Sequence, residues 1–339
     1  MQVIDLEKGK DWSNFLKGNE HLIFHTSKYK EFLKKSFPNV KFEYLAVIDD
    51  GIKALLPIGI IESKLIGNRI ISVPFLEYGS FSGDINYIKP VLDHIKNNYS
   101  KKYQYLEIRL GLDYDNELSK HLIKSEEYKR FVLELKTKEE NWKLLDKQKR
   151  KAIRKAKKSN ITVKELNKDN IEEIYILYLK NMKQFGSPPF YKEFFINFFE
   201  LNLGKCFGAF KDSNLISFLL GFVYKDRIHC IIAASEKKNL ELRPNELAHW
   251  HFIKYGIENG FKYFDLGRVR EESGQFRFKQ EFGCQLMPLH HYYDLYKLKK
   301  IPKTDPASKK YRFAIELWKK MPIIMQRKFG PSIRESLGI

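Results

Sequence analysis

The chain has 339 residues and a formal net charge of +19. Hydrophobic residues make up 43% and aromatic residues 14%, which excludes a disordered chain and leaves enough core material for two domains. The three cysteines form no C-x-x-C pair, so neither a zinc site nor a disulfide framework is indicated. The positive charge favours an anionic partner, which could be nucleic acid, a phospholipid surface or a phosphorylated substrate.

The sequence shows neither the pattern of a secretory signal nor that of a transmembrane segment. The N-terminal residues show no charged segment followed by an apolar run, and no apolar run approaches the ~20 residues that span a bilayer. We therefore expect a cytoplasmic protein without a transmembrane segment.

The first part of the chain has the helix and strand pattern of an α+β domain. Strands are expected at 42–48, 54–61, 70–74, 105–111 and 130–135, and helices at 21–36, 87–99 and 118–124. Asp49-Asp50-Gly51 is typical of a hairpin turn, because Asp-Gly tolerates the positive φ that such turns need. Tyr78 lies in a Gly/Ser loop, 76–84, that either faces a ligand cleft or only closes a sheet.

The most basic segment is Trp142–Lys158, which predicts one helix with an apolar stripe and lysines and arginines around the rest. It is either a solvated helix packed by its stripe or a helix that binds phosphates. For phosphate binding we favour Arg150 and Arg154, because the guanidinium fork suits phosphate oxygens better than an ammonium group.

The second half repeats an α+β order. It predicts a strand at 161–166, helices at 170–183 and 191–203, three antiparallel strands at 206–211, 215–224 and 227–234, a helix at 246–259 and a strand at 261–266. Asn245 is placed to cap the helix at 246–259, after Arg243, and both residues are candidates for binding phosphates of the donor. Lys192 lies in the aromatic-rich helix and is a further candidate anion-binding residue.

The stretch Tyr263–Gly283 combines the last of these strands with an acidic, Gly-containing loop and the alternating sequence Phe276-Arg277-Phe278-Lys279. The alternation predicts a strand with its aromatic and basic side chains on opposite faces. Arg268, Arg277 and Lys279 would then gather near the end of a strand, where they suit a developing negative charge. A half-buried strand with solvated bases is the alternative.

These residues resemble the signature of FemAB-like transferases, which are relatives of the GNAT acyltransferases. The pattern D-x-G-R … S-G-x-x-x-F-K-x-x-x-G is present at Asp265, Gly267, Arg268, Ser273, Gly274, Phe278, Lys279 and Gly283. The basic segment from Lys147 to Ser159 and the run Arg243-Pro244-Asn245 are also similar to that family.

The resemblance implies an α+β fold of tandem GNAT-like domains with a C-terminal helical tail. It implies a transferase that moves an acyl or aminoacyl group onto an amine of an anionic cell-envelope precursor (peptidoglycan peptide, amino sugar or lipid-linked polysaccharide). Lys279 would stabilise the transition state, and Asp265 would orient groups or accept a proton. No tightly bound cofactor and no metal are expected.

The donor stays open between acyl-CoA and aminoacyl-tRNA, because the glycine-rich loop that usually wraps acetyl-CoA is missing. Two alternatives remain: an acyl-CoA-dependent N-acyltransferase acting on a small amine, and a non-catalytic protein that binds tRNA or another nucleic acid.

The expected domains are 1–135, a degenerate GNAT-like domain, 136–298, the transferase domain, and 299–339, a basic linker with an amphipathic tail. Pro322 predicts two short helices in the tail rather than one. The tail either docks on the body of the protein or lies peripherally on an anionic membrane, to which tryptophan and basic residues are suited.

Overall fold

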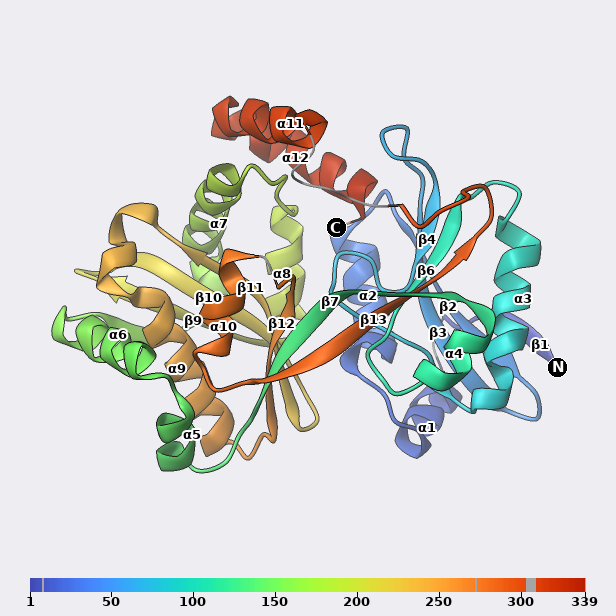
Figure 1. Cartoon of the computed structure of the whole chain (residues 1–339), viewed down its shortest axis with the longest axis horizontal. Coiled ribbons are helices and arrows are strands. Elements are labelled where there is room, and N and C mark those ends of the chain that lie inside the picture. Colours follow the sequence, from blue (N-terminus) through green and yellow to red (C-terminus); the bar gives the residue numbers. More distant parts are fainter. Residues whose placement is uncertain (8, 272, 303–308, 339) are drawn as a thin grey trace. The chain divides into compact units, whose positions relative to one another are not determined.

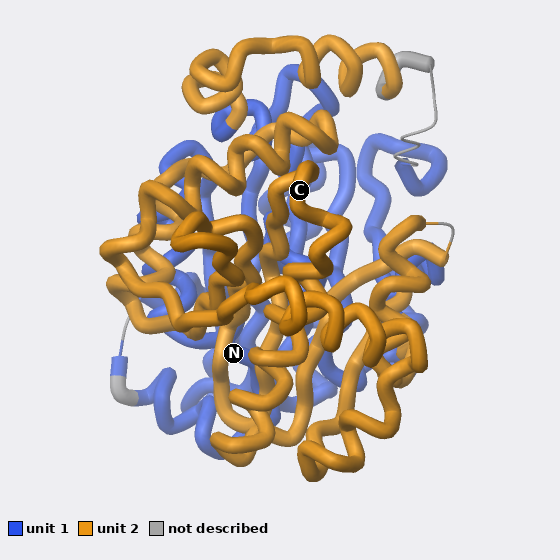
Figure 2. Tube along the Cα trace, turned by 90° about the vertical axis from the view of Figure 1, so that its left-hand side faces the viewer, with its two compact units in different colours: residues 1–128, 289–306, 331–339 blue, residues 129–288, 307–330 orange. Residues whose placement is uncertain are grey.

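The computed structural model describes residues 1–7, 9–271, 273–302 and 309–338 (Figure 1). The chain divides into two compact units (Figure 2). Unit 1 comprises Met1–Tyr128, Leu289–Pro306 and Pro331–Ile339, and unit 2 comprises Lys129–Pro288 and Ala307–Gly330.

This division differs from the expected boundaries for a structural reason. The chain leaves unit 1 within strand β7 (Ile123–Glu134) and returns to it within strand β13 (Gln285–Leu295). In unit 1, β13 pairs with β6 (Tyr105–Arg109), so its second half belongs to that sheet. Part of the expected linker, residues 303–308, and Glu272 of the acidic loop lie outside the described residues.

Unit 1 is a mixed sheet with helices, in the strand order β1-β2-β3-β4-β6-β13, and a short β5 that pairs with β3. Neighbouring strands are antiparallel except β4 and β6, which are parallel. The remaining elements are β1 Gln2–Asp5, α1 Lys10–Gly18, η1 Ile23–His25, α2 Ser27–Ser36, β2 Lys41–Ile48, β3 Ile52–Ile61, β4 Arg69–Ile71, β5 Ser82–Gly83, η2 Ile85–Tyr87, α3 Ile88–Tyr99 and α4 Asp115–His121. The expected turn at 49–51 is confirmed, with Asp50 and Gly51 at φ values of 52° and 96°.

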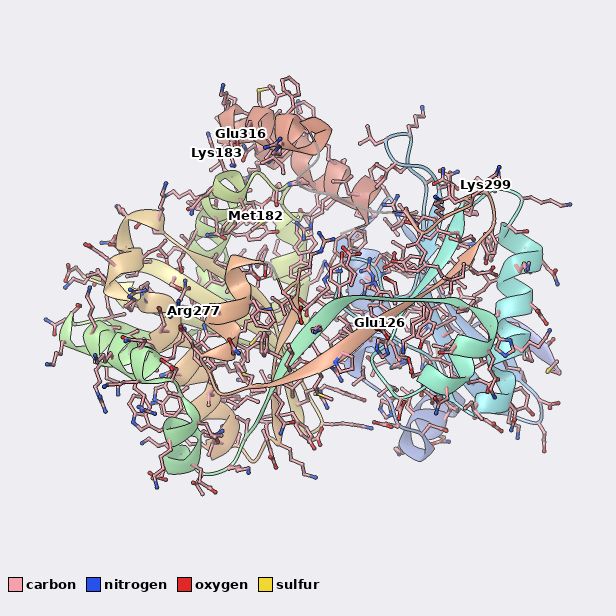
Figure 3. All side chains as sticks on the ribbon, viewed as in Figure 1. Glu126, Met182, Lys183, Arg277, Lys299 and Glu316 are labelled. Carbon is pink, nitrogen blue, oxygen red and sulfur yellow. The ribbon has the colours of Figure 1, made fainter. Side chains whose placement is uncertain are left out.

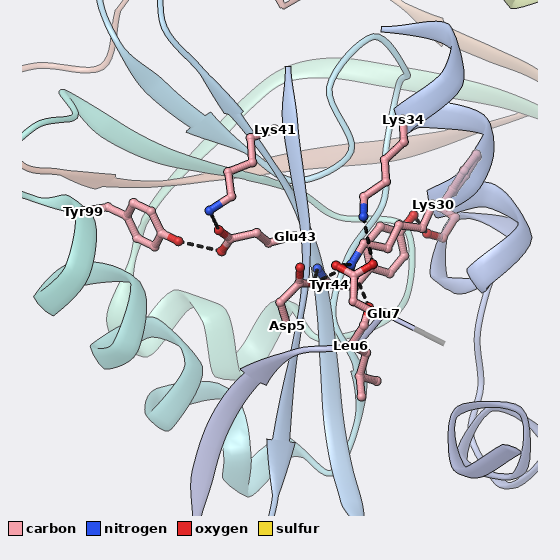
Figure 4. A network of polar contacts seen from close by, with 10 residues as sticks. Asp5, Leu6, Glu7, Lys30, Lys34, Lys41, Glu43, Tyr44 and Tyr99 are labelled. Carbon is pink, nitrogen blue, oxygen red and sulfur yellow. Dashed lines mark hydrogen bonds and ion pairs between the residues drawn. The ribbon is translucent and has the colours of Figure 1, made fainter. Parts of the chain in front are cut away.

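A buried lysine ties the first strand of unit 1 to helix α2 (Figure 4). The Lys30 side chain is 2% exposed, and its Nζ donates to Asp5 Oδ1 and to the Leu6 carbonyl, each at 2.7 Å. Asp5 also accepts from the backbone N–H of Tyr44 at 2.6 Å. A buried ammonium is tolerated only when it is paired in this way, so these contacts hold β1 against the rest of unit 1.

Unit 2 is built around the strand order β7-β12-β11-β10-β9-β8, which is antiparallel except for the parallel pair β11–β12. Its elements after β7 are α5 Lys138–Leu144, α6 Lys147–Lys158, β8 Thr162–Leu166, η3 Lys168–Asn170, α7 Ile171–Phe185, α8 Lys192–Glu200, β9 Gly204–Lys211, β10 Asn214–Tyr224, β11 Arg227–Ser235, η4 Lys237–Leu242, α9 Pro244–Glu258, β12 Tyr263–Val269, α10 Gly274–Gln280 and α11 Lys309–Lys320. Helix α12, Ile323–Leu337, begins in unit 2 and continues into unit 1 from Pro331.

Helices cover both faces of the sheet of unit 2. Alternation along β10 places Leu219 in the core cluster that includes Phe252 of α9 and Ile153 of α6. The next residue towards the N-terminus, Phe218, faces the other way and meets the ring of Phe195 on α8. The order of helices, three antiparallel strands, helix and strand is therefore confirmed.

Two expectations for unit 2 are wrong. Residues 276–279 form part of helix α10 and not a strand. The alternation of aromatic and basic residues gave the wrong prediction because a seven-residue helix is too short to show its 3.6-residue period. The helical spacing is visible instead in Phe278 and Phe282, which are four residues apart and whose rings are in contact. The expected single helix 142–158 is divided into α5 and α6, because Asp146 interrupts it and caps α6 by accepting from the backbone N–H of Gln148 at 2.7 Å.

Candidate active site

The parallel strands β11 and β12 pair over only three residues, from Arg227–Tyr263 to His229–Asp265. Both strands run on past these pairs, to Ser235 and Val269. The pairing of β12 with β7 also shifts register between Asp265 and Arg268. Gly267 lies in that shift at φ 78°, a backbone conformation that L side chains rarely adopt. The strands of unit 2 therefore separate here, and backbone carbonyls become available to side chains.

Lys279 uses two of these carbonyls. Its Nζ donates to the Arg268 carbonyl at 2.8 Å and to the Gly267 carbonyl at 3.1 Å. An ammonium group has three donors, and no partner for the third is found among the described residues. The side chain is half-buried, so its charge is held in place and part of it stays exposed to solvent. Helix α10 and the bulge in β12 thus hold an ammonium group with one hydrogen-bond donor to spare.

Asp265 is the centre of a buried charge cluster. The side chain is fully buried, and its Oδ1 accepts from the backbone N–H of Gly267 at 2.8 Å. Its Oδ2 lies 3.6 Å from Arg130, 3.7 Å from Arg227 and 3.8 Å from His229. These contacts hold the bulge that aims the carbonyls at Lys279. The two roles expected for Asp265, orienting groups or accepting a proton, stay predictions.

Sequence reasoning missed Lys149, the buried lysine of the basic helix. Its side chain is 2% exposed, and its Nζ lies 3.8 Å from the ring centroid of Phe278, 4.6 Å from that of Phe282 and 3.3 Å from Glu281 Oε2. Burial lowers the pKa of Lys149 from its usual value. Lys149 therefore fastens α6 to the end of α10, which carries Lys279. The spacing of Lys149 with Ile153 and Ala156 on the apolar stripe was the signal that could have found it.

His249 of α9 lies against the same aromatic rings. Its ring centroid is 5.2 Å from that of Phe278 and 5.3 Å from that of Phe282. Nδ1 is 2.8 Å from the Asn245 carbonyl oxygen, so Nδ1 carries the proton and donates. Among the described residues, Nε2 has no hydrogen-bond partner. Burial lowers the pKa of His249 to about 4, so the ring is a neutral acceptor at physiological pH.

The shifted pKa of His249 predicts a pH-dependent stability. The unfolded chain takes up this proton near pH 6.5 and the folded chain only near pH 4, so the unfolded state binds more protons between these values. Stability attributable to His249 is therefore lost as the pH falls through this window, by about 2 kcal/mol between pH 7 and 5. Urea unfolding of the wild type and of His249→Gln should show a smaller loss in the variant. An equal loss in the two proteins would contradict the burial of a neutral ring.

The two arginines of the basic helix have different surroundings. Arg150 Nη1 donates to the carbonyls of Leu145 and Lys143 at 2.5 and 3.0 Å, so it caps the end of α5. Arg154 is exposed and lies 5.6 Å over the ring of Trp142. Arg154 is therefore the better placed of the two for an external phosphate, while Arg150 has a demonstrable role in holding the α5–α6 connection.

The N-cap residue of α9 is not the one expected from the sequence. Arg243, and not Asn245, is the N-cap residue, and it adopts a left-handed conformation with φ 63°. Asn245 is the second residue of the helix. Its Oδ1 accepts from Ser217 Oγ at 2.9 Å and from Ser235 Oγ, which ties the helix to β10 and β11. Arg243 is half-exposed and lies 3.5 Å from Glu246.

The remaining expected site residues are dispersed. Arg277 is 82% exposed on α10, pairs with Glu281 at 3.0 Å and projects to the surface of unit 2 (Figure 3). Lys192 forms an ion pair with Glu172 at the start of α8. Arg268 contributes its carbonyl to Lys279. Tyr78 of unit 1 is buried, and its ring meets that of Phe24 edge-on at 5.7 Å, as expected of a loop that closes a core.

Residues 145–280 match the model of the family described as acetyltransferase (GNAT) domain. The fold is similar to the crystal structure of FemX, with 13% identity, a TM-score of 0.68, and coverage of 88% of this chain and 98% of that one. It is similar to the C-terminal domain of a putative lysylphosphatidylglycerol synthetase from Agrobacterium fabrum, with 10% identity, a TM-score of 0.61 and coverage of 94% and 95%.

A third similar structure is a tandem GNAT protein from the clavulanic acid biosynthesis pathway, with 6% identity, a TM-score of 0.55 and coverage of 88% and 99%. A search of curated protein sequences gave no significant match. The fold is therefore that of tandem GNAT-like units, and the domain match lies in the second of them. Residues 145–280 are thus similar to a GNAT-type acyltransferase domain, and the fold of the chain is FemAB-like.

Proposed function

We propose that the protein transfers an aminoacyl or acyl group from an activated donor to an amine of an anionic cell-envelope precursor. The observation that carries this proposal is the ammonium of Lys279, which is held by two carbonyls of β12 with one donor left over. The acceptor would be a peptidoglycan peptide, an amino sugar or a lipid-linked polysaccharide. Both candidate donors, acyl-CoA and aminoacyl-tRNA, are made in the cytoplasm, so we propose that the reaction takes place there.

The proposed chemistry is attack of the amine nitrogen on the activated carbonyl. A C–N bond forms, and the oxygen of the tetrahedral intermediate gains a negative charge that the third N–H of Lys279 stabilises. The bond to the leaving oxygen or sulfur of the donor then breaks. The amine loses a proton to water or to a substrate phosphate, since the carboxylate of Asp265 is fully buried among basic side chains.

One feature supports an anionic donor, and another supports aminoacyl transfer. Helix α6 exposes Lys147, Lys151, Arg154, Lys155, Lys157 and Lys158. Such a row of cations suits the phosphates of aminoacyl-tRNA or of CoA. The similarity of fold to FemX and to a lysylphosphatidylglycerol synthetase supports aminoacyl transfer, and we extend that chemistry to this chain as a proposal.

A second candidate is an acyl-CoA-dependent N-acyltransferase that acts on a small amine. The match of residues 145–280 to an acetyltransferase family favours it. A purely nucleic-acid-binding role is not retained, because the domain is that of a transferase.

The two candidates are separated by one experiment. The protein is incubated with isotope-labelled aminoacyl-tRNA or with a panel of acyl-CoA thioesters, each with envelope precursors or small amines, and the products are weighed by mass spectrometry. An envelope precursor that gains an aminoacyl mass supports the first proposal. A small amine acylated by CoA thioesters alone, with release of free thiol, supports the second, and no transferred mass from any pair contradicts both.

A further inference from the structure

Helix α11 and the part of α12 up to Gly330 belong to unit 2, and one face of α11 packs on α7. Trp318 of α11 is buried, and Gln326 of α12 donates to its carbonyl at 2.5 Å. Ile315 packs so closely on Gly186, at the end of α7, that a Cβ at position 186 would lie 2.5 Å from Ile315 Cγ2. The structure thus confirms that these helices dock on the body of the protein. One apolar face of α11 is accounted for by this contact.

The opposite face is also apolar and is exposed. Phe313 and Leu317, one turn apart on α11, are 72% and 58% exposed, and Ile324 at the start of α12 is 78% exposed. Met325 and Phe329 of α12 are also exposed, at 43% and 46%, and we name the five side chains the tail surface. Exposed apolar residues scattered singly are ordinary, but a concentration of this kind marks a binding surface.

Positive charge surrounds the tail surface. The segment 309–328 contains seven lysines and arginines and one acidic residue, Glu316 (labelled in Figure 3). Arg312, Lys320 and Lys328 are exposed, and no ion-pair partner for them is found among the described residues. Large apolar side chains with cations at their margin match the boundary between the acyl chains and the phosphates of an anionic bilayer.

We propose that the tail surface docks the protein on a membrane that contains anionic phospholipids. The five apolar side chains enter the boundary of the acyl chains, and Arg312, Lys320 and Lys328 contact lipid phosphates. A second copy of the chain fits less well, because a symmetric contact would bring the same cations against each other. Among the described residues no helix is long and apolar enough to cross a bilayer, so the attachment is peripheral.

The test is flotation of the full chain with vesicles of phosphatidylcholine alone or with added phosphatidylglycerol. We expect binding to the anionic vesicles, reduced by high salt, and at least tenfold weaker binding to neutral ones. The double variant Phe313→Ser/Leu317→Ser should bind about tenfold more weakly, and so should Arg312→Gln/Lys320→Gln. The matched control is Leu65→Ser/Ile66→Ser, which removes two exposed apolar residues of unit 1 and should bind normally.

Each other outcome overturns the proposal. Equal binding of the wild type and the Phe313/Leu317 variant would show that the tail surface does not meet lipid. Equal binding to neutral and anionic vesicles would remove the role of the cations. A dimer in analytical ultracentrifugation that the same variant dissociates would assign the surface to a second copy. The measurement needs no donor or acceptor, so it is independent of the proposed transfer reaction.

Discussion

Replacing Lys279 with methionine is expected to lower turnover by roughly 10²–10³-fold, the loss typical of removing one oxyanion donor. The methionine keeps most of the volume of the side chain but carries no N–H, so the charge that develops on the carbonyl oxygen loses its donor. The carbonyls of Gly267 and Arg268 lose a partner as well, but Lys279 is only half-buried and water can replace it. Thermal stability should therefore stay near that of the wild type.

The measurement is kcat of the product-forming reaction identified by mass spectrometry. Gln280→Ala, an exposed neighbour at the end of the same helix, is the matched control and should retain kcat within about threefold. Lys279→Arg keeps the charge with a different geometry and should fall between the wild type and the methionine variant. A near-normal kcat in Lys279→Met would remove this residue from the mechanism.

The substitution Asp265→Asn is expected to destabilise unit 2 by about 3–5 kcal/mol, as found when one partner of a buried ion pair is removed. Arg130, Arg227 and His229 would then face one another without the carboxylate, and the new amide would present a donor to them or to the N–H of Gly267. The bulge that aims the carbonyls at Lys279 should loosen, so that activity falls together with stability.

Urea unfolding followed by the fluorescence of the buried Trp250 in unit 2 measures this effect. Asp212→Asn is the matched control, because Asp212 is 78% exposed and its pair with Lys211 should contribute at most about 1 kcal/mol. A stable Asp265→Asn protein with strongly reduced turnover would instead indicate a direct catalytic role, the second role expected from the sequence.

Much of the fold could be predicted where a pattern is long enough to show its period. The strands β9, β10 and β11 and the helix α9 lie within two residues of the expected bounds, because their alternation or helical spacing runs over eight or more residues. The division of the tail into two helices was predicted correctly, because Pro322 interrupts a helical pattern. The same reasoning predicted a strand in place of helix α10, because this helix is only seven residues long.

The candidate site was only partly predictable. Lys279, Arg268 and Asp265 were selected by the pattern in which they occur, and the structure brings them together around the bulge at Gly267. Lys149 was missed among the many lysines of the basic segment, although its spacing with Ile153 and Ala156 places it on the apolar stripe. Arg150 was assigned to phosphates although its Nη1 caps α5, since the break between α5 and α6 was not foreseen.

The order of helices and strands, the excess of positive charge and the transferase signature were determined by the sequence alone, because each depends on residues that are near one another in the chain. Only the tertiary structure decided which charges are buried, which carbonyls Lys279 meets, and which of the two apolar faces of α11 is covered. Those properties depend on partners from distant segments, such as Arg130 for Asp265 and Gly186 for Ile315. Local periodicity carries no information about such partners, because they are chosen by packing.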